Sequence, residues 1–196
     1  SGLAGMGLPA FHAALAVRGG GRVDARGEVV PEFGAWADAL WMRCRDRYRA
    51  LATRDATTMN ALLPQGAWPP GIRLRVQRDG ADLGWAVVLD TQMEGDRRFG
   101  RLRVGSVIDC LAAPEDAAAV AGVAWRFLRD RGVDLVFSNQ SHPAWIQAFG
   151  AHGFLLLKDR RVFAASPALQ EACAPLGDTL AGLHLTNMDG HGPMRL

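Results

Sequence analysis

Lysine, tyrosine and cysteine are scarce in this chain of 196 residues. Lysine occurs once among 22 basic residues, at Lys158, and tyrosine occurs once, at Tyr48. The cysteines are Cys44, Cys110 and Cys173, an odd number at spacings that match no metal motif. We therefore expect reduced thiols and a cytoplasmic location.

The chain also lacks a strong charge of one sign and any long apolar run. Its formal net charge is +2 and its arginines are scattered, which argues against nucleic acid or an anionic membrane as a partner. The first 17 residues have no basic region, hold Pro9 and His12, and are too weakly apolar for a membrane span. We expect neither a secretory signal nor a membrane span.

What remains is a series of segments with clear periodicity. Apolar residues at three- and four-residue spacing predict helices, and alternation or short apolar runs predict strands. Proline at a first turn followed by Glu115 and Asp116 marks the start of a further helix, which ends before Gly132. In chain order the expected elements are a helix from Pro31 to Tyr48, a short helix Asp55–Leu63, strands Ile72–Gln77, Gly84–Leu89 and Leu102–Leu111, the helix from Pro114, strand Asp134–Ser138, helix Pro143–Ala151, strands Phe154–Leu157 and Val162–Ala165, and helix Pro167–Ala174 before an irregular tail.

This order predicts the fold class. Antiparallel neighbours come first and a strand–helix–strand crossover second, so we expect an α/β (α+β) fold with a mixed, mostly antiparallel central sheet and helices on both faces. Residues 1–30 are expected to form a weak helix and linker, 31–165 the domain itself, and 166–196 a C-terminal helix and tail.

Residues 134–154 carry a family resemblance. A strand and a short helix are followed by Phe149 and then, four and five residues later, by Gly153 and Phe154. This stretch resembles the GNAT (N-acetyltransferase) superfamily of acyltransferases, and residues 32–165 follow the same plan. The resemblance implies a V-shaped splay between the strand ending near Leu111 and the strand Asp134–Ser138, where an acyl-thioester enters.

Three shorter pieces are similar to the second domain of tandem GNAT-like proteins from bacterial polysaccharide and cell-envelope clusters. They are Ala37–Trp41 with Arg54 and Asp55, Val107–Leu111, and the tail from Leu185 to His191. This narrower resemblance implies a companion domain on the N-terminal side, and it implies that the tail closes over the substrate cleft.

The resemblance also implies a coenzyme site. It places the arm of acetyl-CoA, or of another acyl-CoA, against the backbone of Cys110, Leu111, Ala112 and Ala113 and beside Asn139. The family's phosphate loop is rich in glycine, whereas residues 112–117 of this chain contain none. Pro114 removes an N–H donor there, and two carboxylates follow it. We therefore expect free coenzyme A to bind weakly.

The candidate proton acceptors are Asp109, near the end of a buried strand, and His142, just before a short helix. The family usually has a tyrosine as proton donor where this chain has Phe149, and Tyr48 lies far away in sequence. Alternatives stay open for each candidate. Asp109 can be a hydrogen-bonded structural carboxylate, His142 a helix cap, and Cys110 either a nucleophile or an inert buried thiol.

Two functions are compatible with these residues. The first is an acyltransferase that moves an acyl group from coenzyme A or a carrier-protein thioester to an amine. The second is a GNAT-like module without catalysis that holds substrate or forms a homodimer. The tail residues His184, Asp189 and His191 are of metal-ligating types, but their spacing matches no metal motif and we expect no metal.

The altered loop gives the first prediction. Replacing Glu115 and Asp116 together by glycine should strengthen acetyl-CoA binding, because two negative charges then leave the place where the pyrophosphate would lie. Calorimetry on the unaltered protein and the double variant measures this. Sub-micromolar affinity of the unaltered protein would contradict it.

Overall fold

A five-stranded sheet in the order β1-β3-β4-β5-β6 forms the centre of the molecule, whose computed structural model describes residues 24–66, 70–157 and 166–189. All neighbouring strands are antiparallel except β5 and β6, which are parallel. The strands are β1 (Arg26–Val30), β3 (Ile72–Arg78), β4 (Ala81–Gln92), β5 (Arg103–Ala112) and β6 (Leu135–Ser138). A separate parallel pair is formed by β2 (Ala50–Leu51) and β7 (Leu183–His184).

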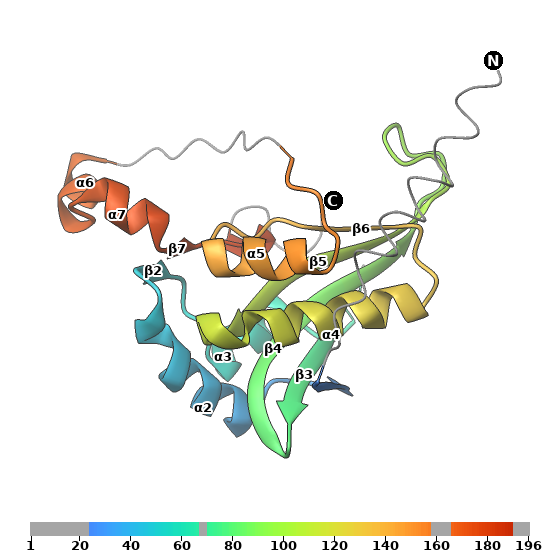
Figure 1. The fold of residues 1–196 in the computed structure, drawn as a ribbon, viewed down its shortest axis with the longest axis horizontal. Helices are drawn as coiled ribbons and strands as arrows, with labels where there is room; N and C mark the ends of the chain where they lie inside the picture. The colour runs from blue at the N-terminus through green and yellow to red at the C-terminus, as the bar shows by residue number, and fades with distance from the viewer. Residues whose placement is uncertain (1–23, 67–69, 158–165, 190–196) are drawn as a thin grey trace.

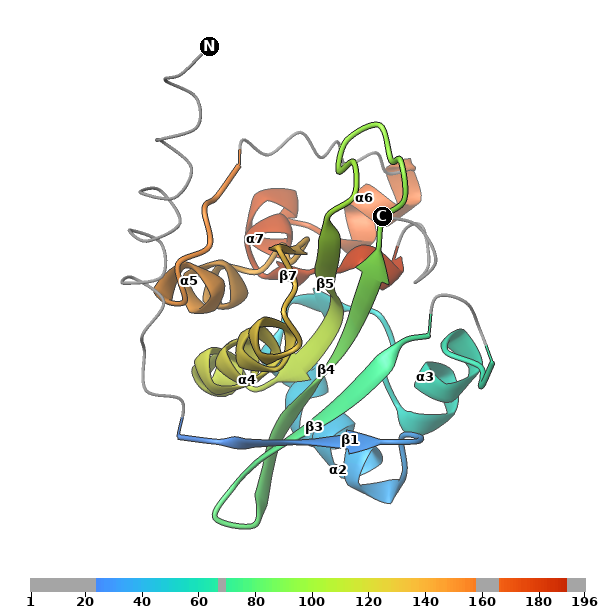
Figure 2. The same ribbon diagram turned by 90° about the vertical axis from the view of Figure 1, so that its right-hand side faces the viewer.

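Helices cover both faces of this sheet (Figures 1 and 2). α4 and α5 lie on one side, and α2 and α3 lie on the other. Their bounds are α2 (Ala35–Cys44), α3 (Ala56–Leu62), α4 (Ala117–Asp130), α5 (Pro143–Ala151), α6 (Pro167–Ala172) and α7 (Leu176–Ala181), with short 3-10 turns η1 (Arg45–Arg47), η2 (Pro114–Asp116) and η3 (Asn187–Asp189). The predicted fold class is therefore confirmed.

The core lies along the middle of β4 and nearly all of β5, which are buried because helices pack on both of their faces. The turn η2, which starts at Pro114, leads directly into α4, as the helix-start pattern predicts. α4 packs on the sheet through four buried residues, Val120, Val123, Ala124 and Leu128. On the opposite face Phe33 packs edge-on against Trp85, with ring centroids 5.0 Å apart.

A β-bulge in β5 creates the open edge at which the site is built. Val87 pairs with Asp109 and Val88 pairs with Val107, so Ile108 is the extra residue. The pairing of β5 with β6 ends at the same place, with Val107 opposite Ser138. Because a bulge bends its strand and increases its twist, β5 continues to Ala112 without β6 beside it. The predicted adjacency of these two strands is confirmed.

Several predicted elements need correction. Arg26–Val30, expected to be part of a linker, is the edge strand β1, because it pairs along its whole length with β3. Phe154–Leu157, expected to be a strand, has no regular structure, and Leu155, Leu156 and Leu157 are exposed. The tail expected to be irregular contains α7 and β7. The expected strand Val162–Ala165 lies outside the described residues.

Gly84 gives a prediction about stability. A Cβ there would lie 2.4 Å from the Leu111 carbonyl oxygen and 2.7 Å from Val120 Cγ2. Gly84→Ala should lower the free energy of unfolding by about 1–3 kcal/mol, since β4 and β5 cannot separate without loss of packing. Gly150→Ala in α5 is the matched control, because a Cβ there meets nothing within 4 Å. Urea unfolding measures both, and an equal change in the two variants would contradict the prediction.

Candidate functional site

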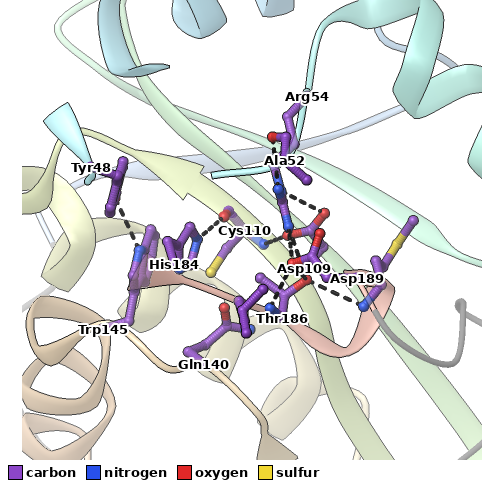
Figure 3. A network of polar contacts seen from close by, with 12 residues as sticks. Tyr48, Ala52, Arg54, Asp109, Cys110, Gln140, Trp145, His184, Thr186 and Asp189 are labelled. Atoms are coloured by element: carbon purple, nitrogen blue, oxygen red, sulfur yellow. Dashed lines mark hydrogen bonds and ion pairs between the residues drawn. The ribbon is translucent and has the colours of Figure 1, made fainter. Parts of the chain in front are cut away.

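The open edge of β5 is closed by side chains from distant segments (Figure 3). His184 Nε2 donates to the Cys110 carbonyl at 2.9 Å, and the Tyr48 hydroxyl donates to the Ala112 carbonyl at 2.7 Å. The Cys110 N–H donates to Asp109 Oδ1 at 2.8 Å. These contacts lie where the resemblance places an acyl-thioester.

The C-terminal segment enters the splay as a short strand. β7 pairs with β2 through Ala50 and Leu51. On its other side Ser141, which follows β6, accepts from Leu185 N–H at 2.7 Å and donates to the Leu183 carbonyl at 2.6 Å through its hydroxyl. Residues 183–185 therefore lie between β2 and the chain leaving β6, and they fill the space that opens beyond the bulge.

Two aromatic rings from other elements pack against His184 of this segment. The His184 ring stacks on Tyr48 at 4.9 Å and on Trp145 at 5.6 Å, and Trp145 Nε1 donates to the Tyr48 hydroxyl at 3.1 Å. Burial lowers the pKa of His184 to about 3 and raises the pKa of Tyr48. Both side chains are therefore neutral at pH 7. His184 Nδ1 has no hydrogen-bond partner among the described residues.

Arg54 joins β5 to the C-terminal segment. Its Nε lies 3.1 Å from both carboxylate oxygens of Asp109, and its Nη2 lies 2.6 Å from Asp189 and 3.2 Å from the Thr186 hydroxyl. The Arg54 side chain is only 2% exposed. Burial disfavours its charge, but the two carboxylates outweigh that effect and raise its pKa. Two carboxylates thus share one buried guanidinium.

Asp109 has the environment of a structural carboxylate. Burial raises its pKa, and the Arg54 guanidinium opposes that shift. Its side chain is 1% exposed and accepts from both Arg54 and the Cys110 N–H. In this arrangement it has no exposed oxygen to offer to a substrate amine, so a role as proton acceptor requires a different position of Arg54.

His142 caps α5, as one of its two interpretations predicts. Its Nδ1 accepts from the Ala144 N–H at 3.2 Å, so the proton of the neutral ring is on Nε2. Burial lowers its pKa, which favours the neutral ring. Its ring packs edge-on against Tyr48 at 4.8 Å. To accept a proton at Nδ1, His142 would have to lose its hydrogen bond with the Ala144 N–H. To donate a proton from Nε2, it would keep that hydrogen bond.

The residues predicted to contact the coenzyme differ in their surroundings. The carbonyls of Cys110 and Ala112 are already hydrogen-bonded, Leu111 and Ala113 are buried, and Asn139 is exposed just after β6. Burial raises the pKa of the Cys110 thiol well above its usual value, so the thiol is protonated and unreactive.

At the start of α4, where a pyrophosphate was expected to fit badly, Glu115 forms an ion pair with Arg47 at 3.0 Å. Phe149, in the family's tyrosine position, is buried against Phe154 at 4.9 Å. The glycine between them, Gly153, has φ of +87°, which explains why glycine is needed after α5.

Sequence analysis missed the residues that complete the site: Tyr48, Arg54, Trp145, His184 and Asp189. Two signals were present. Tyr48 is the single tyrosine, and Arg54 and the tail already belonged to the pieces similar to tandem GNAT-like proteins. Neither signal could place them against β5, because Tyr48 lies 64 residues from Ala112 and His184 lies 74 residues from Cys110.

No group of three or more metal-ligating side chains is arranged around a common point in the described ranges. His184 and Asp189 bond to Cys110 and Arg54 instead, and His191 lies outside those ranges. Within the same ranges no helix combines the length and apolar character that a membrane crossing requires.

Comparisons with known proteins give no family-model match and no match among curated proteins. Among solved structures the chain is similar to a ribosomal-protein-alanine N-acetyltransferase from Brucella melitensis biovar Abortus 2308, with 14% identity and a TM-score of 0.46 over 72% of this chain and 98% of that one. It is also similar to an aminoglycoside acetyltransferase from an uncultured soil metagenomic sample in complex with trehalose, with 9% identity and a TM-score of 0.45 over 73% and 96%.

A third similar structure is the aminoglycoside N-acetyltransferase AAC(6')-Iy in complex with CoA, with 15% identity and a TM-score of 0.43 over 73% of this chain and 98% of that one. All three neighbours are acetyltransferases. With identities of 9–15% and TM-scores of 0.43–0.46, these structures do not indicate the substrate of this chain. Its function has to be argued from its own residues.

The shared guanidinium gives a prediction. Arg54→Ala should lower the free energy of unfolding by about 3–5 kcal/mol, because Asp109 and Asp189 are left without a partner. Neutralising both carboxylates as well (Asp109→Asn, Asp189→Asn) should recover part of this loss. The control is Arg45→Ala, which removes an exposed ion pair with Asp46 and should change the value by about 0.5 kcal/mol or less. Urea unfolding is the measurement, and a loss below 1 kcal/mol for Arg54→Ala would show that the pair is not needed.

Proposed function

We propose that this chain is a GNAT-type acyltransferase domain that moves an acyl group from a thioester to an amine, and that its thioester slot is closed by its own residues in the form described. The observation that supports this most is the open edge of β5. The strand runs past the end of β6 from the bulge at Ile108 to Ala112, and it presents two carbonyls to donors that are not part of the sheet.

Those two carbonyls suit a thioester arm. Cys110 and Ala112 are two residues apart on a strand, which separates their carbonyls by about 6.6 Å. An extended arm with amide groups, such as pantetheine, can hydrogen-bond along such an edge as an added strand does. The His184 N–H and the Tyr48 O–H occupy the positions of its amide donors. Binding therefore requires residues 183–185 and Tyr48 to move.

The reaction itself would form a C–N bond as the thioester C–S bond breaks. The amine loses a proton and the thiolate gains one. Asp109 and His142 are the proposed proton acceptors, and each must first release its present partner. Phe149 supplies no proton to the thiolate, so turnover is expected to be slow, since a positioned acid contributes about 10²–10⁴-fold.

A second candidate is the GNAT-like module without catalysis, as a substrate-holding or dimerising half of a larger protein. One observation favours it specifically. Both outward carbonyls of β5, the Asp109 carboxylate and His142 Nδ1 are all hydrogen-bonded within the protein. A site in which these acceptors are all occupied is well suited to stability and poorly suited to turnover.

Removal of the His184 donor separates the two candidates. His184→Ala should increase acetyl-CoA affinity about tenfold, because the Cys110 carbonyl becomes free to accept from the arm; tenfold corresponds to about 1.4 kcal/mol. His152→Ala is the matched control, since His152 is also buried and its Nε2 lies 3.2 Å from a backbone carbonyl, that of Ala118, away from the slot.

Calorimetry gives the affinities, and transfer of radiolabelled acetyl groups to a panel of primary amines gives the activity. The acyltransferase is supported if acetyl-CoA affinity rises in His184→Ala but not in His152→Ala and acetyl transfer is detected. No transfer in any variant, with affinity unchanged by His184→Ala, favours the module without catalysis.

A further inference from the structure

An exposed basic segment lies at one end of the thioester slot. Residues 43–49, the arginine segment, contain four arginines and one aspartate. All four arginines are exposed, namely Arg43, Arg45, Arg47 and Arg49. A second stretch, residues 97–103, also holds four arginines, but it lies at the end of β5 opposite to the slot.

The arginine segment is attached to the slot by Tyr48. Tyr48 has extended backbone, with φ of −118° and ψ of 147°, so its side chain and those of its two neighbours point to opposite sides. Its own hydroxyl reaches inward to the Ala112 carbonyl at 2.7 Å. Arg47 and Arg49 are therefore held outside, at the end of the slot that lies farthest from the bulge.

Each of these two arginines contacts a different wall of the slot. Arg47 Nη2 reaches Glu115 at the start of α4, at 3.0 Å. The Arg49 N–H donates to the Gly182 carbonyl at 3.0 Å, directly before β7. A thioester arm lying along Cys110 and Ala112 would leave the slot between α4 and β7, and its phosphate end would come out among the arginines.

The start of α4 disfavours the rest of a free coenzyme. Glu115 and Asp116 place two carboxylates beside the N-terminus of the helix, and Pro114 offers no N–H. The pyrophosphate of coenzyme A would meet that negative charge. A phosphopantetheine arm on a carrier protein has a single phosphodiester, which needs fewer donors, and it has no adenosine.

We infer that the acyl donor of this domain is an acidic carrier protein bearing a phosphopantetheine thioester, whose surface docks on the arginine segment while its arm enters the slot. This inference rests on the proposed function, because it names the donor for the same slot. Opposite charge on the two surfaces steers association and fixes orientation.

The surroundings of the segment favour a protein over a nucleic acid. Asp46, Glu115 and Asp116 lie among or beside the arginines. Such interspersed carboxylates can pair with the basic residues that an acidic protein surface also carries, but they repel the unbroken phosphate backbone of a nucleic acid.

The test uses a purified bacterial acyl carrier protein in its apo, holo and acetyl-holo forms. The variant is Arg45→Glu/Arg49→Glu. The matched control is Arg97→Glu/Arg98→Glu, which makes the same charge change on the exposed β4–β5 turn at the opposite end of β5. Binding is measured by calorimetry at two salt concentrations, with acetyl-CoA and a short RNA as competitors.

We expect the acetyl-holo carrier to bind at least about tenfold more tightly than the apo carrier does and than acetyl-CoA does. Its binding should weaken at higher salt. Arg45→Glu/Arg49→Glu should weaken it about tenfold or more, and Arg97→Glu/Arg98→Glu should not. Equal binding of acetyl-CoA, equal loss in both variants, or displacement by RNA would overturn the inference.

Acetyl transfer to an amine keeps this inference apart from the proposed function. Transfer from acetyl-CoA without any carrier binding supports the acyltransferase and overturns the carrier as donor. Carrier binding that depends on Arg45 and Arg49 without transfer supports the docking surface and counts against the acyltransferase.

Discussion

The ion pair between Arg54 and two carboxylates holds the site together. Asp109 belongs to β5 and Asp189 to the C-terminal segment, 55 and 135 residues from Arg54 in sequence. Charges removed from water are tolerated only when they are paired and hydrogen-bonded. Arg54 meets that condition for both carboxylates, and it cannot do so unless the C-terminal segment lies against β5.

The other contacts of the slot follow from that arrangement. Asp189 accepts from Thr186 N–H at 2.8 Å, which fixes the turn after β7 and keeps His184 against Cys110. His184 in turn forms the surface on which Tyr48 and Trp145 stack. The same interactions that complete the core would therefore compete with the thioester that we propose binds there. A ligand that binds only after residues 183–185 and Tyr48 have moved has its apparent affinity reduced in proportion to the fraction of molecules in that open form.

The sequence was informative where structure is local. Alternating Ile72–Gln77, the apolar run in β4 and the proline start before α4 all gave elements close to the observed ones. Apolar character alone misled at Leu155–Leu157, which is exposed. The strand Arg26–Val30 has no alternating pattern and lies beside a glycine-rich stretch. In both cases pairing, which a single sequence does not display, decided the outcome.

The site was predictable to the same extent. Asp109, Cys110 and Ala112 could be named because they stand at the end of a recognisable strand, and His142 because it precedes a proline-started helix. Their partners could not be named, because two-residue strands such as β7 leave almost no periodic pattern and because an arginine in a loop looks the same whether it is solvated or buried.

The distance in sequence between β5 and β7 also sets an order of events in biosynthesis. His184 is made 74 residues after Cys110, which at ribosomal rates of 5–20 residues per second is about 4–15 s later. Throughout that interval β5 has its neighbour β4 but not the segment that caps its free edge, and Arg54 has Asp109 but not Asp189. A nascent chain therefore carries, for seconds, a strand edge able to pair with other chains, until the segment around β7 is made and covers it.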